Sequence, residues 1–136
     1  MALWLFKEEP THYSFAQLQR DRRTVWDGVR NALARQHLRQ MRKGDRAFYY
    51  HTGKEKAIIG VVRVVSDPWT VPEAEDPKEV LVKVEAVRLL PHAVPLARIK
   101  DDPLLADWDL VRLPRLSVLP VTEEQWRRVG ELSEQG

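Results

Sequence analysis

Cysteine is absent from the 136 residues, and this absence excludes several kinds of chemistry at once. Without thiols the chain has no disulfide framework, no thiolate metal site and no cysteine nucleophile. The first apolar run, which ends before Lys7, is too short for a signal peptide, and no later run approaches membrane-spanning length. We therefore expect a cytoplasmic protein without a bound metal or cofactor.

Recognisable catalytic motifs are missing as well. The six scattered glycines form neither a phosphate-binding loop nor a nucleotide fingerprint, and there is no Gly-x-Ser-x-Gly elbow. The four histidines, at positions 12, 37, 51 and 92, never stand four residues apart, which is the spacing of a helical metal site. Glu8 and Glu9 are adjacent, and a strand would point them to opposite sides rather than pair them. We predict that the protein is not an enzyme.

Asparagine is also scarce, since Asn31 is its only occurrence, and arginines outnumber lysines fifteen to seven. Few thermolabile residues are typical of thermophile proteins, although GC-rich coding gives the same bias. The one asparagine that the chain keeps is therefore a candidate for a specific role.

The net charge of +2 conceals an uneven distribution along the chain. Through position 46 there are ten lysines and arginines against five acidic residues, and after it twelve against fifteen. Arg30 precedes a predicted helix on which Arg35, Arg39 and Arg42 share one face. Such a face either contacts nucleic-acid phosphates or is simply solvated, and the spacing does not decide between the two.

Hydrophobic periodicity predicts one domain, residues 1–136, in which strands build the core and short helices lie outside it. We expect strands near residues 3–7, 46–51, 57–65, 79–90 and 115–121, and helices near 14–20, 31–43, 96–99, 104–108 and 122–132. Residues 21–24 and 67–77 are expected to be loops, the second with Trp69 as its only large anchor. Gly60, inside the strongest strand, indicates a bulge or a barrel bend. The predicted class is α+β, a small β barrel with peripheral helices.

Three clusters place polar residues beside aromatic ones where a strand ends: residues 6–10, 26–31 and 48–52. A pocket for a nucleobase needs aromatic faces for stacking and hydrogen-bonding groups for the base edge. Trp26 and either Tyr49 or Tyr50 can supply the faces, although Trp26 fits a core position equally well. The groups for the base edge are expected from Asn31, Thr52, Ser117 and the backbone amides of Gly28 and Val29.

Five stretches, in order along the chain, resemble the signatures of the EVE domain. They are Trp4 to Pro10 with Tyr13 and Ser14, Trp26 to Asn31, Tyr50 to Thr52, Gly60, and Arg115 to Val121. The resemblance implies a PUA-like β pseudobarrel of mixed strands with peripheral short helices, related to the YTH readers of methylated adenine. It also implies a ligand pocket drawn from Lys7, Glu9, Trp26, Gly28, Val29, Asn31, Tyr50, His51, Thr52, Leu116 and Ser117, with backbone contacts from Arg30, Arg35, Arg39 and Arg42.

The chain departs from the family pattern at two positions that bear on ligand binding. Glu8 stands where relatives often have serine, and Ala32 stands where they often have tyrosine. Trp69 and Trp4 are both candidates to replace the aromatic wall that Ala32 lacks.

We predict a protein, favoured to be a monomer, that binds nucleic acid without catalysis. It would recognise a modified base, such as a methylated one, of DNA or RNA, by flipping it out where the target is a duplex. The alternative is a small-molecule or protein-binding module that keeps the pocket but does not bind nucleic acid. The small net charge and Glu8 favour this second interpretation.

Overall fold

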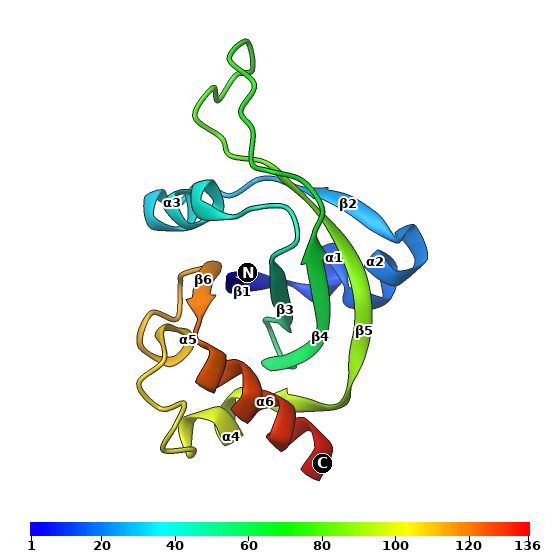
Figure 1. The fold of residues 1–136 in the computed structure, drawn as a ribbon, viewed down its shortest axis with the longest axis vertical. Helices are drawn as coiled ribbons and strands as arrows, with labels where there is room; N and C mark the ends of the chain where they lie inside the picture. The colour runs from blue at the N-terminus through cyan, green and yellow to red at the C-terminus, as the bar shows by residue number, and fades with distance from the viewer.

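The structure is a computed structural model that describes residues 1–136. Its strands are β1 (Leu3–Glu8), β2 (Arg23–Trp26), β3 (Arg46–His51), β4 (Ala57–Val64), β5 (Val82–Pro95) and β6 (Val118–Val121). Its helices are α1 (Pro10–Tyr13), α2 (Phe15–Asp21), α3 (Ala32–Gln40), α4 (Leu96–Lys100), α5 (Asp109–Arg112) and α6 (Glu123–Gln135). Figure 1 shows these helices arranged around one strongly curled sheet.

The sheet has the strand order β2-β5-β4-β3-β1-β6. Strands β1 and β3 run parallel, and the other neighbouring pairs are antiparallel. The fourteen residues of β5 pair with β2 and β4, and the β4–β5 register shifts between Ile58 and Gly60. Such shifts bend a strand and let a sheet curl towards a barrel. The predicted α+β pseudobarrel of mixed strands with peripheral short helices is confirmed.

The bend at Gly60 depends on the absence of a side chain there. A Cβ atom on this residue would lie 2.6 Å from the ring of Phe15 and 2.9 Å from the carbonyl oxygen of Arg88. Real Cβ atoms do not approach other atoms so closely, and one of these groups is backbone. The bulge predicted at Gly60 is therefore confirmed, and its cause is the close approach of α2 and β5.

Capping side chains begin the helices where the sequence indicated. Ser14 accepts the backbone N–H of Gln17, and Thr122 forms a complete capping box with Gln125. Helix α6 packs against β5, and its Trp126 stacks on Phe48 of β3 with 3.9 Å between ring centroids. The apolar stripe predicted for this helix thus closes one end of the core.

Several predicted boundaries need correction. Residues 23 and 24, predicted to be loop, instead begin β2, because pairing with β5 supplies hydrogen bonds that local propensity does not reveal. Helix α3 ends at Gln40 rather than at residue 43, since Met41 turns extended and the carboxylate of Asp45 takes the backbone N–H of Arg42. Strand β5 continues to Pro95, β6 begins only at Val118, and residues 104–108 form turns before α5.

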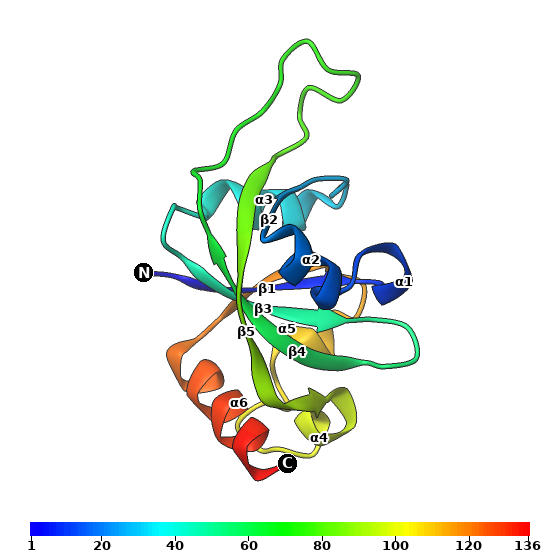
Figure 2. The ribbon, with the colours of Figure 1, turned by 90° about the vertical axis from the view of Figure 1, so that its right-hand side faces the viewer.

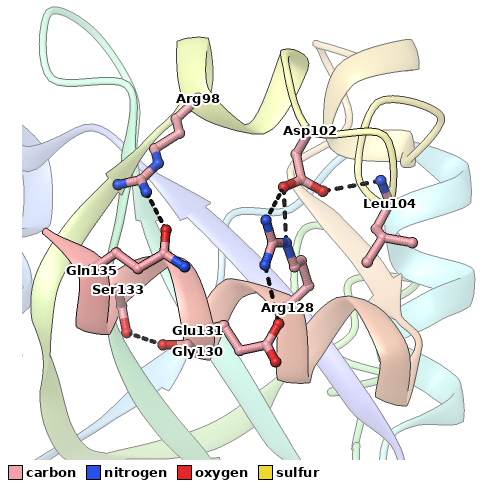
Figure 3. Close-up of polar contacts among 8 residues, drawn as sticks. All are labelled: Arg98, Asp102, Leu104, Arg128, Gly130, Glu131, Ser133 and Gln135. Atoms are coloured by element: carbon pink, nitrogen blue, oxygen red, sulfur yellow. Dashed lines mark hydrogen bonds and ion pairs between the residues drawn. The ribbon is translucent and has the colours of Figure 1, made fainter.

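A buried ion pair fixes α6 to the segment that follows α4 (Figure 3). Asp102 is 6% exposed and accepts a hydrogen bond from the Arg128 Nε at 2.8 Å and another from the backbone N–H of Leu104 at 3.0 Å. The Nη2 of Arg128 lies 2.8 Å from the same carboxylate. Arg128 also pairs with Glu131 at 3.2 Å. Removing one partner of such a pair leaves the other charge buried and unpaired, so the pair holds this corner of the fold together.

This pair predicts an acid-dependent stability. The Arg128 guanidinium lowers the pKa of Asp102, so its stabilising effect is complete above the unfolded-state pKa of about 4 and is lost as pH falls through the lower folded value. The melting temperatures of wild type and Asp102→Asn, measured between pH 7 and pH 2, are expected to converge on acidification. The exposed neighbour variant Asp101→Asn is the control, with a small difference at every pH. A difference between wild type and Asp102→Asn that stays constant with pH would contradict this assignment.

Candidate nucleic-acid interface

Trp26, the last residue of β2, lies mostly in the core. Its side chain is 6% exposed and packs between Phe6, at 5.0 Å between ring centroids, and Tyr49, at 5.7 Å and nearly perpendicular. Aromatic pairs in these tilted and edge-on geometries add to the stability gained by burial. Most of the indole therefore stabilises the fold, and only part of it can meet a ligand.

The indole N–H of Trp26 is the part that remains free. The indoles of Trp4 and Trp108 donate to the Asp45 carboxylate at 2.9 Å and to the Pro120 carbonyl at 3.2 Å. The indole of Trp26 donates to no acceptor in the protein, and its nitrogen is not sealed from solvent. A buried indole N–H normally finds a partner, so this donor is available to a ligand.

Trp26 lines a hollow of about 190 Å³ between α1 and β2, which we call the Trp26 hollow. It is lined by Glu8, His12, Tyr13, Thr24, Val25, Trp26 and Asp27. The volume suits a group smaller than a drug-sized ligand, such as one pyrimidine ring. The lining combines two aromatic rings, two carboxylates and two hydroxyls, which are the elements that recognition of a base requires.

The polar groups of the Trp26 hollow are held by local contacts. Glu8 accepts the backbone N–H of Glu9 at 2.9 Å and lies 3.2 Å from the imidazole Nδ1 of His12. The Tyr13 hydroxyl donates to Asp21 at 2.8 Å, and burial together with that carboxylate raises the pKa of Tyr13. Asp27 is exposed and forms no ion pair. The lining of the hollow thus combines the acceptors of Glu8 and Asp27 with the indole of Trp26.

The loop that follows Trp26 uses its polar groups to hold itself in place. The backbone N–H of Gly28, at a positive φ of 74°, donates to Glu79 at 2.6 Å, and the Val29 carbonyl accepts from Arg35 at 2.7 Å. Asn31 caps α3 by accepting the backbone N–H of Ala34 at 2.9 Å. The single asparagine therefore does have a specific role, and that role is structural in this arrangement.

The two neighbouring tyrosines of β3 face opposite sides of the sheet. Tyr49 faces Trp26 and donates its hydroxyl proton to the Tyr13 carbonyl, whereas Tyr50 faces Lys7, whose ammonium lies 5.8 Å from its ring centroid. His51 is buried, its Nε2 accepting the backbone N–H of Phe15 at 3.0 Å and its Nδ1 donating to Glu55 at 2.8 Å. The aromatic partner of Trp26 is therefore Tyr49, not Tyr50.

The remaining residues predicted for one pocket are divided among different hollows. Lys7, Tyr50 and Thr52 line a hollow of about 260 Å³, while Asn31 and Leu116 line another of about 310 Å³. Glu9 borders a fourth, and the Ser117 carbonyl accepts the backbone N–H of Lys7 at 2.9 Å. No hollow is lined by Trp26, Asn31 and Tyr50 together. The reason is strand alternation, which sends Lys7 and Glu8 to opposite faces of β1.

The predicted arginine face is divided as well, and Arg35 requires correction. Its side chain is 13% exposed, pairs with Asp76 of the β4–β5 loop and lowers the pKa of that carboxyl, so it anchors the loop. Arg39 and Arg42 remain exposed and border a hollow of about 470 Å³ together with Trp69. Trp69 itself is 36% exposed rather than a buried anchor, and its backbone pairs with Leu81. Both belong to the loop between β4 and β5, which protrudes from the rest of the molecule in Figure 2.

No three His, Cys, Asp or Glu side chains are grouped so that they could hold a metal ion. None of the helices has the length and apolar character needed to cross a membrane.

Comparison with known proteins adds to this geometry. The EVE domain family model matches residues 2–132. Thymocyte nuclear protein 1 of Gallus gallus is 32% identical over 97% of this chain and 69% of its own length. The NMR structure of Rpa0253 from Rhodopseudomonas palustris superposes with a TM-score of 0.93 at 39% identity, covering 99% of this chain and 94% of that one.

The human THYN1 protein, solved in complex with 5-methylcytosine-containing DNA, superposes with a TM-score of 0.91 at 32% identity, covering 100% of this chain and 99% of that one. The predicted resemblance is confirmed, because the family model spans nearly the whole sequence and the solved chains of these relatives share the fold. This chain belongs to the EVE domain family.

Proposed function

We propose that this protein binds DNA that carries a modified cytosine, holds the flipped base in the Trp26 hollow, and performs no chemistry on it. The observation that carries the proposal is that Trp26, whose indole N–H has no partner in the protein, lines a small hollow together with carboxylate acceptors. The similarity to a human relative solved with 5-methylcytosine-containing DNA supports the choice of ligand.

The edge of cytosine matches the groups that line the hollow. Its exocyclic amino group donates, and the carboxylates of Glu8 and Asp27 accept; carboxylates are the usual partners of this amino group. Its ring nitrogen and carbonyl oxygen accept, and the indole of Trp26 and the hydroxyl of Thr24 donate. The methyl group of a modified cytosine would meet Val25, as thymine methyl groups meet apolar side chains.

The basic surface around Arg39 and Arg42 would contact the DNA backbone. Both side chains are exposed, and with Arg30 they are free of ion pairs. Phosphate contacts position a protein on DNA without reading sequence, while a flipped base supplies the selectivity. The exposed ring of Trp69 beside these arginines offers a stacking face for a neighbouring base.

Fluorescence anisotropy with labelled duplexes tests the proposal. Two duplexes that differ only in one 5-methylcytosine are titrated with wild type, Trp26→Phe and Glu8→Gln. We expect wild type to bind the methylated duplex more tightly than the unmethylated one. Each variant is expected to bind the methylated duplex roughly tenfold more weakly than wild type does, because one hydrogen bond to the base edge is lost. Trp26→Phe keeps an aromatic ring in the core, so a loss of affinity in this variant would report on the missing indole N–H.

Glu124→Gln, an exposed change on α6, is the matched control and should keep the preference. The same titration with single-stranded RNA bearing the modified base separates RNA from DNA. Equal affinity of wild type for modified and unmodified strands of both kinds would refute the base-reading role and favour a small-molecule ligand for the hollow.

A further inference from the structure

A second hollow lies on the other face of β1 from the Trp26 hollow. It measures about 260 Å³, and we call it the lysine hollow because its polar lining consists of Lys7, Tyr50, Thr52, Lys56 and Lys100. Apolar residues and a glycine make up the rest, and no acidic residue lines it. Three lysines thus line one small hollow, and no carboxylate belongs to its lining.

The lysines of this hollow have no ionic partners elsewhere. All seven ion pairs of the protein use arginine or histidine as the cation. Lys7 donates one hydrogen bond, to the Pro114 carbonyl at 2.9 Å, which leaves two of its three N–H groups free. Burial lowers the pKa of Lys7, and a bound anion would offset that unfavourable desolvation.

Tyr50 contributes an unused hydroxyl to the same space. Its side chain is 3% exposed, yet its hydroxyl has no hydrogen-bond partner in the protein and is not sealed from solvent. The hydroxyl of Tyr49, on the opposite face, is bonded to the Tyr13 carbonyl. Burial raises the pKa of Tyr50 to about 12, so at neutral pH the group is a hydrogen-bond donor. The hydroxyl of Thr52, which also lines the hollow, donates to the Glu9 carboxylate at 3.4 Å.

The backbone holds Lys56 at the rim of this hollow. Lys56 has a φ of +45°, which is uncommon for a residue with a side chain, and its carbonyl accepts the backbone N–H of Leu96 at 2.8 Å. This bond joins the β3–β4 turn to the start of α4, at whose other end Lys100 lies. Lys56 and Lys100 therefore belong to two segments, the β3–β4 turn and α4, that are joined by this hydrogen bond.

We propose that the lysine hollow binds a phosphate group. Three lysines and the unbonded hydroxyl of Tyr50 line the hollow, no carboxylate does, and a phosphate group offers acceptor oxygens with a negative charge. The phosphate comes either from a small phosphorylated molecule or from the DNA backbone. The site does not rest on base binding, and it stands even if the Trp26 hollow takes no cytosine.

Isothermal titration with inorganic phosphate and with a nucleoside 5′-monophosphate, at low salt, tests this assignment. Saturable binding is expected in wild type, weakened roughly tenfold or more in Lys100→Gln and in Tyr50→Phe, each of which removes one donor to a charged ligand. Lys54→Gln, in the neighbouring turn but outside this lining, removes the same charge and should bind like wild type.

DNA titration of the same variants identifies the source of the phosphate. Weaker DNA binding by Lys100→Gln assigns the hollow to a backbone phosphate, whereas unchanged DNA binding with weakened mononucleotide binding assigns it to a separate phosphorylated ligand. The proposal is overturned if Lys100→Gln and Tyr50→Phe match wild type with every probe. Because inorganic phosphate contains no base to read, its result is independent of the outcome for the Trp26 hollow.

Discussion

Trp26→Ala is expected to lower the free energy of unfolding by about 3–5 kcal/mol, the usual loss when a buried tryptophan is truncated. The ring is 6% exposed and contacts Phe6 and Tyr49, so its removal leaves a cavity between β1, β2 and β3. That loss is a large fraction of the stability of a small domain, commonly about 5–15 kcal/mol.

Urea denaturation followed by circular dichroism measures this effect. Trp69→Ala is the matched control, because its ring is 36% exposed and surface substitutions commonly change stability by only about 0.5 kcal/mol. If both variants unfolded at the same urea concentration, Trp26 would not be the core residue that its contacts indicate. The result also decides which variant can test binding. Trp26→Ala would lose affinity through unfolding as well as through lost contacts, whereas Trp26→Phe keeps an aromatic ring in the core.

The double variant Arg39→Glu, Arg42→Glu is expected to weaken DNA binding by roughly tenfold or more for methylated and unmethylated duplexes alike. Each arginine that neutralises a phosphate releases counterions, so losing two contacts should flatten the dependence of log affinity on log salt by about two. Anisotropy titrations at several salt concentrations give both quantities.

Arg88→Glu, Arg127→Glu is the control for net charge, since it changes the total charge equally on exposed positions of β5 and α6. It should reduce DNA affinity only slightly and leave the salt dependence unchanged. A similar loss in both double variants would mean that DNA responds to total charge, and the face of α3 would not be a contact surface.

Much of the fold could be predicted from the sequence where the signal is local. The capping residues Ser14 and Thr122 mark helix starts by a short-range hydrogen bond, and Gly60 marks a bend by lacking a side chain. Strand β2 could not be predicted in the same way, because its four residues become a strand only by pairing with β5, about sixty residues away.

The candidate site shows the same limit. Trp26 was identified from its polar neighbours, but Tyr13 and Thr24 reach its hollow only because α1 and β2 lie side by side. Glu8 departs from the family pattern, and strand alternation turns it away from Lys7 and towards the Trp26 hollow. The order of the motifs along the chain indicated the family, whereas the pairing of the strands determines which motif residues line the same hollow.

The indole N–H resonances, observed by two-dimensional NMR during titration with a methylated duplex, test the central claim most directly. The Trp26 resonance, assigned by its disappearance in Trp26→Phe, is expected to shift as the base accepts its hydrogen bond. The Trp4 and Trp108 resonances, already bonded inside the protein, should stay in place, and the unmethylated duplex should shift Trp26 much less. A Trp26 resonance that does not move while DNA binds would contradict recognition in this hollow.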